Sequence, residues 1–341
     1  MTDTIEREPA TTAAPADHGH YIRPDVQAFV TMLGALPGPK LHEIGHVAAR
    51  QQYGAMKEMV DPPLGDLAEV RDLCIPGPAG TIPARLFDAR ASREPGPAVV
   101  FFHGGGYTIG DLDTHASFCA EVARTLDLPV VAVDYRLAPE AKWPAAPDDA
   151  EAAARWVSGN PAELGRSVTG LVFMGDSAGG NLTIVTAMAL RDTPAAVPVI
   201  AQIPIYPATD STRDYDSYEL FADHGYVLTR DSMTWFTECY GADLTHMRSS
   251  PLAGDLAKLP PALVVTASLD PIRDQGRAYA AALAMAGVPV TFREMVGTIH
   301  GFITLRKAMP SAQGDVAQIL ALAKPMIAAA EADRVMRQAA G

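Results

Sequence analysis

The chain has 341 residues, 48% of them hydrophobic, which is enough to bury the core of one large domain or of two modest ones. Its 27 basic and 40 acidic side chains give a net charge of −13. So acidic a chain lacks the basic patches that nucleic acids and anionic membranes require. Its three widely spaced cysteines form no C-x-x-C pair, which argues against a disulfide framework and a structural zinc site.

The N-terminal region divides into two parts. Residues 1–19 are rich in Thr, Ala, Pro and Glu, which is typical of a disordered tail. They do not resemble a secretion signal, and no run of about 18 apolar residues predicts a membrane span, so we expect a cytoplasmic protein. Residues 20–62 show two helical patterns and predict an N-terminal helical cap.

Residues 63–335 alternate short, β-rich apolar runs with helical patterns and predict one catalytic domain. Several runs are apolar throughout, as in strands that are buried on both faces of a parallel sheet. The expected fold class is therefore α/β, an eight-stranded, mostly parallel sheet flanked by helices. The candidate strands are residues 68–75, 81–87, 98–102, 130–134, 171–174, 199–203, 262–268 and 290–295, and a turn-rich link joins the first two as a hairpin.

A glycine-rich loop follows the candidate strand 98–102. His103 is followed by Gly104, Gly105 and Gly106, and bare backbone N–H groups in such a loop can stabilise an oxyanion. A dinucleotide-binding loop is excluded, because Ile109 occupies the position of the third glycine in that pattern.

The sequence G-D-S-A-G at 175–179 follows the apolar run 171–174 and precedes a helical pattern. A G-x-S-x-G sequence in this setting places its serine on a sharp, strained turn that exposes the hydroxyl above the sheet. Ser177 is therefore the candidate nucleophile, and the N–H of Ala178 is a candidate oxyanion donor. The pattern also occurs by chance, so its weight depends on partners elsewhere in the chain.

The segment at about 207–245 is dense in aromatic residues, and we expect it to leave the sheet and contribute to the cap and the substrate pocket. Trp235 and Phe236 follow a helical spacing and are expected in the core. The candidate pocket residues are Tyr107, Asp176, Tyr206, Tyr226 and Leu228.

A carboxylate and a histidine follow two later strands. Asp270 comes directly after an apolar run, at the edge where parallel sheets place functional groups. His300 follows the last candidate strand by a short loop, and its imidazole can take the Ser177 proton while Asp270 orients the ring. Asp134 also ends a candidate strand and stays an alternative, whereas Asp274 is expected to cap a helix.

Residues 42–46 match H-E-x-x-H, the pattern of zinc metallopeptidase helices. Two histidines four residues apart share one helix face. The extended pattern is not met, because Ala49 and Gln52 occupy its later positions, and no third ligand is evident. We therefore expect His42 and His46 to face solvent on a cap helix, and we expect no metal.

Together these motifs resemble the bacterial hormone-sensitive-lipase-like family of α/β-hydrolase esterases. The resemblance covers about residues 65–330 and implies an eight-stranded sheet with a cap built largely from N-terminal helices. It also implies hydrolysis of short-acyl carboxylic esters without a metal or organic cofactor. The segments that carry it are 103–107 (H-G-G-G-Y), 134–140 (D-Y-R-L-A-P-E), 175–181 (G-D-S-A-G-G-N), 270–274 (D-P-I-R-D) and 300–302 (H-G-F).

Transferred to this sequence, the resemblance makes Ser177 the nucleophile, His300 the general base and acid, and Asp270 the orienting carboxylate. The expected partner is a small-molecule ester, with no nucleic acid and no integral membrane segment, and a homodimer stays open. The oxyanion donors that it implies are the N–H groups of Gly105, Gly106 and Ala178, with Gly104 as a further candidate.

Other functions remain possible on the same fold. Plant gibberellin receptors resemble this family but lack the catalytic histidine, so the presence of His300 favours an enzyme over a ligand-binding module. An amidase, lactonase or deacetylase could use the same three residues, because fold and catalytic residues do not set the substrate.

Overall fold

A single sheet organises the chain, which a computed structural model describes over residues 19–224 and 226–340. The sheet has eight strands in the order β1-β2-β4-β3-β5-β6-β7-β8. β2 runs antiparallel to β1 and β4, and all other neighbours are parallel, which confirms the expected fold class. The strands are β1 (Glu69–Gly77), β2 (Gly80–Asp88), β3 (Gly96–Phe102), β4 (Val130–Val133), β5 (Val168–Asp176), β6 (Val199–Ile205), β7 (Ala262–Leu269) and β8 (Val290–Ile299).

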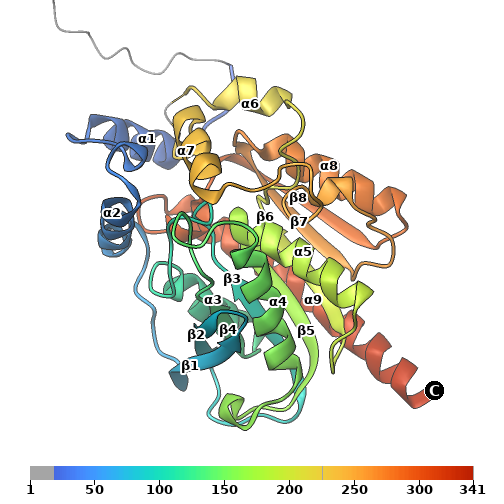
Figure 1. The fold of residues 1–341 in the computed structure, drawn as a ribbon. Helices are drawn as coiled ribbons and strands as arrows, with labels where there is room; N and C mark the ends of the chain where they lie inside the picture. Colours follow the sequence, from blue (N-terminus) through green and yellow to red (C-terminus); the bar gives the residue numbers. More distant parts are fainter. Residues whose placement is uncertain (1–18, 225, 341) are drawn as a thin grey trace, which may run out of the picture.

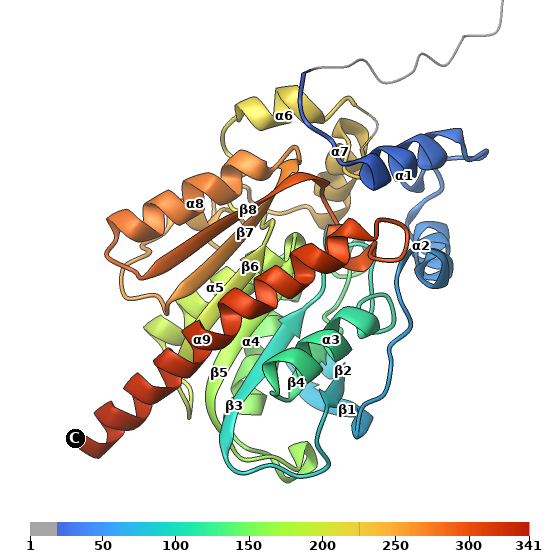
Figure 2. The ribbon, with the colours of Figure 1, turned by 180° about the vertical axis from the view of Figure 1, so that it is seen from behind.

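Helices cover both faces of this sheet. α4 (Ala145–Ser158), α5 (Ala178–Asp192) and α8 (Arg273–Met285) lie on the face toward the viewer in Figure 1. α3 (Ala116–Leu126) and α9 (Ser311–Ala340) cover the opposite face (Figure 2). The central strands are buried on both sides, which explains why their sequences are apolar without alternation.

Two elements differ from the sequence-based expectation. α9 is a helix of 30 residues that the patterns did not predict, because Pro325 interrupts an alanine-rich sequence whose apolar face is weak. β8 extends to Ile299, so His300 follows the strand directly rather than after a loop. The extension contains a bulge against β7, where Gly297 adopts the left-handed conformation that glycine tolerates, with φ +76°.

Four further helices lie outside the sheet layers, three of them toward the carboxyl ends of the central strands and one, α2, at the side (Figure 1). We refer to α1 (Pro24–Ala35), α2 (His46–Val60), α6 (Asp216–Phe221) and α7 (Arg230–Tyr240) as the outer helices. The expected tail at residues 1–19 lies outside the described residues, apart from Gly19. None of the described helices is both long and apolar enough to cross a lipid bilayer.

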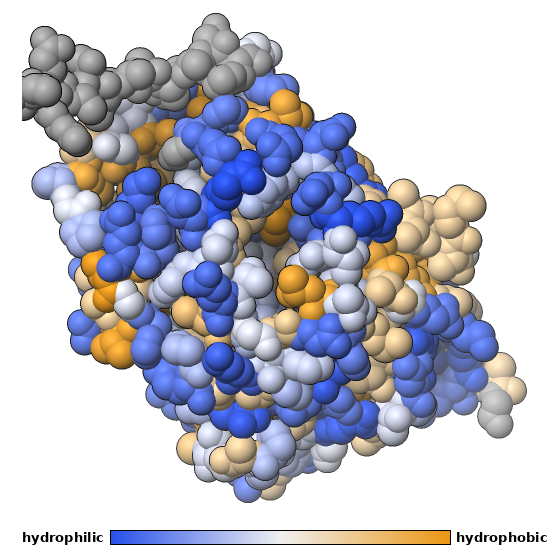
Figure 3. Space-filling model, turned by 45° about the horizontal axis from the view of Figure 1, so that its top comes forward, coloured by the Kyte–Doolittle hydropathy of each residue, from blue (hydrophilic) through white to orange (hydrophobic). Residues whose placement is uncertain are grey.

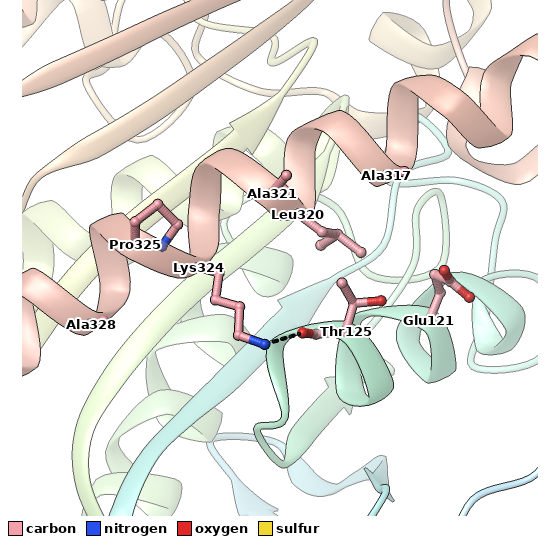
Figure 4. A pocket seen from close by; sticks show the side chains of 8 residues that line it. All are labelled: Glu121, Thr125, Ala317, Leu320, Ala321, Lys324, Pro325 and Ala328. Atoms are coloured by element: carbon pink, nitrogen blue, oxygen red, sulfur yellow. Dashed lines mark hydrogen bonds between the residues drawn. The ribbon is translucent and has the colours of Figure 1, made fainter.

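A groove of about 480 Å³ runs along the back of the molecule between α3 and α9 (Figure 4). Lys324 on α9 donates a hydrogen bond across it to the Thr125 carbonyl oxygen, over 3.1 Å. The lining residues include none of the candidate catalytic side chains, so this groove is separate from the candidate site.

Candidate active site

Ser177 occupies a strained turn between β5 and α5. Its φ of +54° and ψ of −115° lie outside the regions that residues with a side chain normally adopt. The turn is feasible because its neighbours are glycines: a Cβ on Gly175 would overlap the Gly179 carbonyl, and a Cβ on Gly179 would overlap the Phe102 carbonyl. The Ser177 hydroxyl therefore stands at the carboxyl edge of the sheet, as the G-x-S-x-G sequence predicts.

Three side chains from three strand ends form one chain of hydrogen bonds. The Ser177 Oγ lies 2.8 Å from His300 Nε2, and His300 Nδ1 lies 2.7 Å from Asp270 Oδ2. The other oxygen of Asp270 accepts a hydrogen bond from the Ile272 N–H over 2.9 Å. Asp270 is fully buried and His300 is 7% exposed, so the orientation of the imidazole is fixed from behind.

The glycine loop at 103–106 presents backbone N–H groups beside this serine. Within the described residues, the N–H groups of Gly105, Gly106 and Ala178 donate to no protein acceptor. The Gly104 N–H differs, because it donates to Asp176 Oδ1 over 2.7 Å. The inclusion of Gly104 among the candidate oxyanion donors is therefore wrong in this conformation.

A tight turn sets the direction of the free N–H groups in the glycine loop. Gly105, Gly106 and Tyr107 have positive φ values of +118°, +57° and +58°. The Gly105 carbonyl oxygen accepts the N–H groups of both Thr108 and Ile109, over 3.0 and 2.9 Å. Three successive residues with positive φ are costly for any sequence that lacks glycine at the first two, which explains the G-G-Y order.

Asp176 anchors the glycine loop from below. Besides the Gly104 N–H, its carboxylate contacts His115 Nε2 at 3.3 Å and the Tyr206 hydroxyl at 3.3 Å. Burial acts to raise the pKa of Asp176, but the nearby imidazole of His115 and the Gly104 N–H outweigh it, so the pKa lies below its ordinary value. His115 is buried in this contact.

The alternative carboxylates contact other groups. Asp134 lies 3.9 Å from His103 Nε2, and burial raises the pKa of Asp134 to about 6. Burial, with His115 nearby, lowers the pKa of His103 to about 4, so this imidazole is neutral at pH 7 and gives Asp134 no positive partner. Asp274 accepts a hydrogen bond from the Ser217 N–H and pairs with Arg273. Asp270 is the carboxylate that meets His300.

The expected pocket residues lie at different depths. Tyr206 is 1% exposed and its ring contacts those of His300 and Phe302, so it supports the histidine rather than lining an open space. Tyr107 stacks on Tyr240 with ring centroids 3.7 Å apart. Leu228 is buried, and Tyr226 is partly buried and packs against the core. Asp176 is likewise buried beneath the site rather than exposed to a cleft.

Phe236 lies beside the candidate site, although the sequence interpretation placed it elsewhere. We expected it and Trp235 in the core, but both are only partly buried on α7. The Phe236 ring lies directly against the Gly106 backbone, since a Cβ on Gly106 would overlap its ring carbons. No local signal identifies this contact, because it joins residues far apart in the sequence.

The H-E-x-x-H sequence does not form one helix. His42 lies in a short 3₁₀ turn, Leu41–Glu43, and His46 begins α2 after Gly45, whose φ is +75°. The expectation of two imidazoles on one helix is therefore wrong. His42 lies 4.0 Å from Asp231 and His46 lies 3.3 Å from Glu140. Over residues 19–224 and 226–340, no three His, Cys, Asp or Glu side chains gather as a metal site would need.

Known proteins are similar to this chain in sequence and fold. A family model described as an α/β hydrolase fold matches residues 99–304. The carboxylic ester hydrolase LipN of Mycobacterium tuberculosis is 41% identical over 269 residues, which cover 76% of this chain and 70% of LipN. An ethyl acetate hydrolase of Pseudomonas putida is 32% identical over 310 residues, which cover 88% of this chain and 97% of that enzyme.

Solved structures agree with these sequence comparisons. The hyperthermophilic esterase of the archaeon Pyrobaculum calidifontis superposes with a TM-score of 0.84 at 36% identity, over 90% of this chain and 99% of that one. The matched region contains the glycine loop, the serine turn and both partners of the serine. The chain therefore belongs to the bacterial hormone-sensitive-lipase-like family of α/β-hydrolase carboxylesterases.

Proposed function

We propose that Ser177, His300 and Asp270 carry out the ester hydrolysis that is characteristic of this family. The observation that carries the proposal is the continuous hydrogen-bonded chain from Ser177 Oγ to His300 Nε2, and from His300 Nδ1 to Asp270. Ser177 attacks the ester carbonyl while His300 takes its proton. Asp270 holds the imidazole in the required tautomer and stabilises the imidazolium that forms.

The tetrahedral intermediate needs donors for its negative oxygen. We assign this role to the N–H groups of Gly105, Gly106 and Ala178, which donate to no acceptor among the described residues. One such donor is typically worth about 3 to 4 kcal/mol of transition-state stabilisation. His300 then gives its proton to the leaving alcohol, and water activated by the same imidazole releases the acid from Ser177.

The preferred esters have short acyl chains. Phe236 lies against Gly106 and limits the space beside the proposed oxyanion site. The similarity to an ethyl acetate hydrolase points in the same direction. We further propose that residues 20–62 and the excursion at about 207–245 form a cap over this edge of the sheet. Figure 3 views this side, where mostly pale and blue residues, with some orange hydrophobic ones, surround a small hollow near the centre.

Covalent labelling tests the nucleophile directly. The protein is treated with a fluorophosphonate, digested, and the labelled peptide is identified by mass spectrometry. We expect one label per chain, on Ser177, and none on the Ser177→Ala variant. The same variant should lose at least about 10⁴-fold in kcat on p-nitrophenyl acetate. Turnover like that of the wild type by Ser177→Ala would refute the assignment.

A panel of p-nitrophenyl esters from acetate to palmitate tests the acyl preference. We expect the highest kcat/KM among the short chains. A maximum on emulsified long-chain esters would contradict the short-acyl proposal without affecting the assignment of Ser177.

A further inference from the structure

Arg50 connects an outer helix to the glycine loop. It lies on α2, and its guanidinium donates from Nε to the Thr108 carbonyl oxygen over 2.7 Å and from Nη2 to the Ala138 carbonyl oxygen over 2.8 Å. Both Nη atoms also donate to the carboxylate of Glu140, each over 2.7 Å. One side chain of α2 thus makes four hydrogen bonds to two separate loops.

Both carbonyl oxygens belong to the backbone that shapes the glycine loop. Thr108 closes the turn, because its N–H donates to the Gly105 carbonyl over 3.0 Å and its hydroxyl donates to the Gly106 carbonyl over 3.1 Å. The Ala138 N–H donates to the Tyr107 carbonyl over 2.8 Å. Arg50 therefore bridges the end of the turn to the segment that holds its middle.

The turn needs such support. Gly105, Gly106 and Tyr107 all have positive φ, and Tyr107 reaches this conformation despite its side chain. The alignment of N–H groups with a developing oxyanion must be accurate to a fraction of an ångström for the donors to act fully. A planar guanidinium is suited to this task, because its donors have fixed relative directions.

We propose that Arg50 is a positioning residue for the oxyanion site: it fixes the turn that directs the Gly105 and Gly106 N–H groups. This inference rests on the proposed function, since it presumes that these groups stabilise the oxyanion. It implies that α2 contributes to the rate of the chemical step as well as to covering the site. Arg50 touches no reacting atom in the proposed mechanism and acts only through the backbone.

The two kinds of contact made by Arg50 differ in importance. The Glu140 side chain is 53% exposed, and ion pairs in such a setting contribute little to stability. The bonds to the Thr108 and Ala138 carbonyls are the ones that connect to the turn. Glu140 completes the hydrogen bonds of the guanidinium on its exposed side, and His46 Nε2 lies 3.3 Å from the same carboxylate.

The test compares Arg50→Ala, Arg50→Lys and Glu140→Gln with the wild type on p-nitrophenyl acetate. We expect Arg50→Ala to lower kcat by about 10- to 100-fold with KM changed less than about threefold, because oxyanion donors act mainly in the transition state. Arg50→Lys keeps the positive charge but loses the planar guanidinium with its several fixed donors, so its kcat should fall at least about fivefold. Glu140→Gln leaves the hydrogen bonds from Arg50 to the Thr108 and Ala138 carbonyls in place, so its kcat should stay within about threefold of the wild-type value.

A transition-state analogue separates positioning from general destabilisation. A trifluoromethyl ketone adds reversibly to the serine and places an oxyanion against the same donors, so its inhibition constant should rise with Arg50→Ala by a factor similar to the loss in kcat. The matched control is Lys57→Ala on the same helix, which removes a 3.9 Å ion pair to Asp113, outside the turn at residues 105–108. Lys57→Ala should leave both kcat and the inhibition constant of the ketone unchanged.

The outcomes distinguish this inference from the proposed function. If the wild type is not labelled by fluorophosphonate, the proposed function fails. If the wild type is labelled and active but Arg50→Ala keeps its kcat and its affinity for the ketone, the positioning role is overturned. If Arg50→Ala does not fold, Arg50→Lys is the deciding variant. A kcat and a ketone affinity equal to those of the wild type would overturn the inference, and parallel losses in kcat and in ketone affinity would support it.

Discussion

The carboxyl edge of the sheet and the outer helices hold their side chains in different ways. Ser177, Asp270 and His300 each follow a strand directly, and β5 to β8 are paired side by side. α2 buries Ala49 and Val60, and long side chains also connect it to the rest of the chain, such as Arg50 to Glu140 and Lys57 to Asp113. α1 buries Val26, Phe29 and Val30 in the core, and Arg23, directly before it, pairs with Asp315 at 2.6 Å.

The sheet edge places its side chains accurately, whereas long side chains on the outer helices can adapt to small movements. Strand ends inherit their positions from a hydrogen-bonded ladder, so side chains that must meet within a few tenths of an ångström can be placed there. Long side chains reach across gaps and tolerate shifts of the helix that carries them. We therefore propose that the sheet edge carries the chemistry and that the outer helices select the substrate, with Arg50 as one connection between the two regions.

The strongest test of the sheet edge is Asp270→Asn. A carboxamide can donate to His300 Nδ1 and thereby hold the proton on Nε2, where it cannot accept from Ser177. We expect kcat to fall about 10⁴-fold while the thermal midpoint changes by only a few degrees. Asp274→Asn is the control, since Asp274 lies four residues further on and meets Ser217 and Arg273 instead. A large loss with Asp274→Asn and none with Asp270→Asn would reverse the assignment.

The outer helices are tested by Phe236→Ala on α7. Removal of the ring that lies on Gly106 should open space for longer acyl chains. We expect the ratio of kcat/KM for octanoate over acetate to rise about 10-fold, in line with the modest energies of apolar pockets. Thr237→Ala changes the exposed neighbouring residue on α7 and should leave the ratio as it is. An equal change of the ratio in Phe236→Ala and Thr237→Ala would show that Phe236 does not limit the acyl chain.

A smaller effect concerns Asp134, which is mostly buried beside a neutral His103 at the sheet edge. Its folded pKa of about 6 exceeds the ordinary value of 3.8, so folding disfavours its charge. The resulting destabilisation is absent below about pH 3.8, accumulates as the pH rises toward 6, and is complete above it. Asp134→Asn should therefore raise stability at pH 8 by about 1 to 2 kcal/mol.

Thermal midpoints measured from pH 4 to pH 8 check this prediction. The gap between Asp134→Asn and the wild type should widen with rising pH. Asp113→Asn provides a control of opposite sign, because the hydrogen bond from Arg85 lowers the pKa of Asp113. Its removal should destabilise the protein at neutral pH. A gap for Asp134→Asn that does not depend on pH would show that the carboxylate carries no such penalty.

The sequence predicted the sheet because its signals are local. The central strands appear as apolar runs, and their burial on both faces explains why alternation is missing there. The serine turn was equally predictable, since the strain at Ser177 requires glycine at 175 and 179 within five residues. The meeting of Asp270 and His300 followed from their positions after neighbouring strands, which end at one edge.

Only the tertiary structure decided which groups that are distant in sequence share a contact. It assigned the Gly104 N–H to Asp176, paired that carboxylate with buried His115, and moved Phe236 from the expected core to the glycine loop. It also divided the H-E-x-x-H sequence between a 3₁₀ turn and a helix start. These contacts depend on how separate elements pack and on where each side chain points. Neither produces a repeating pattern in the sequence, so the sequence could not predict them.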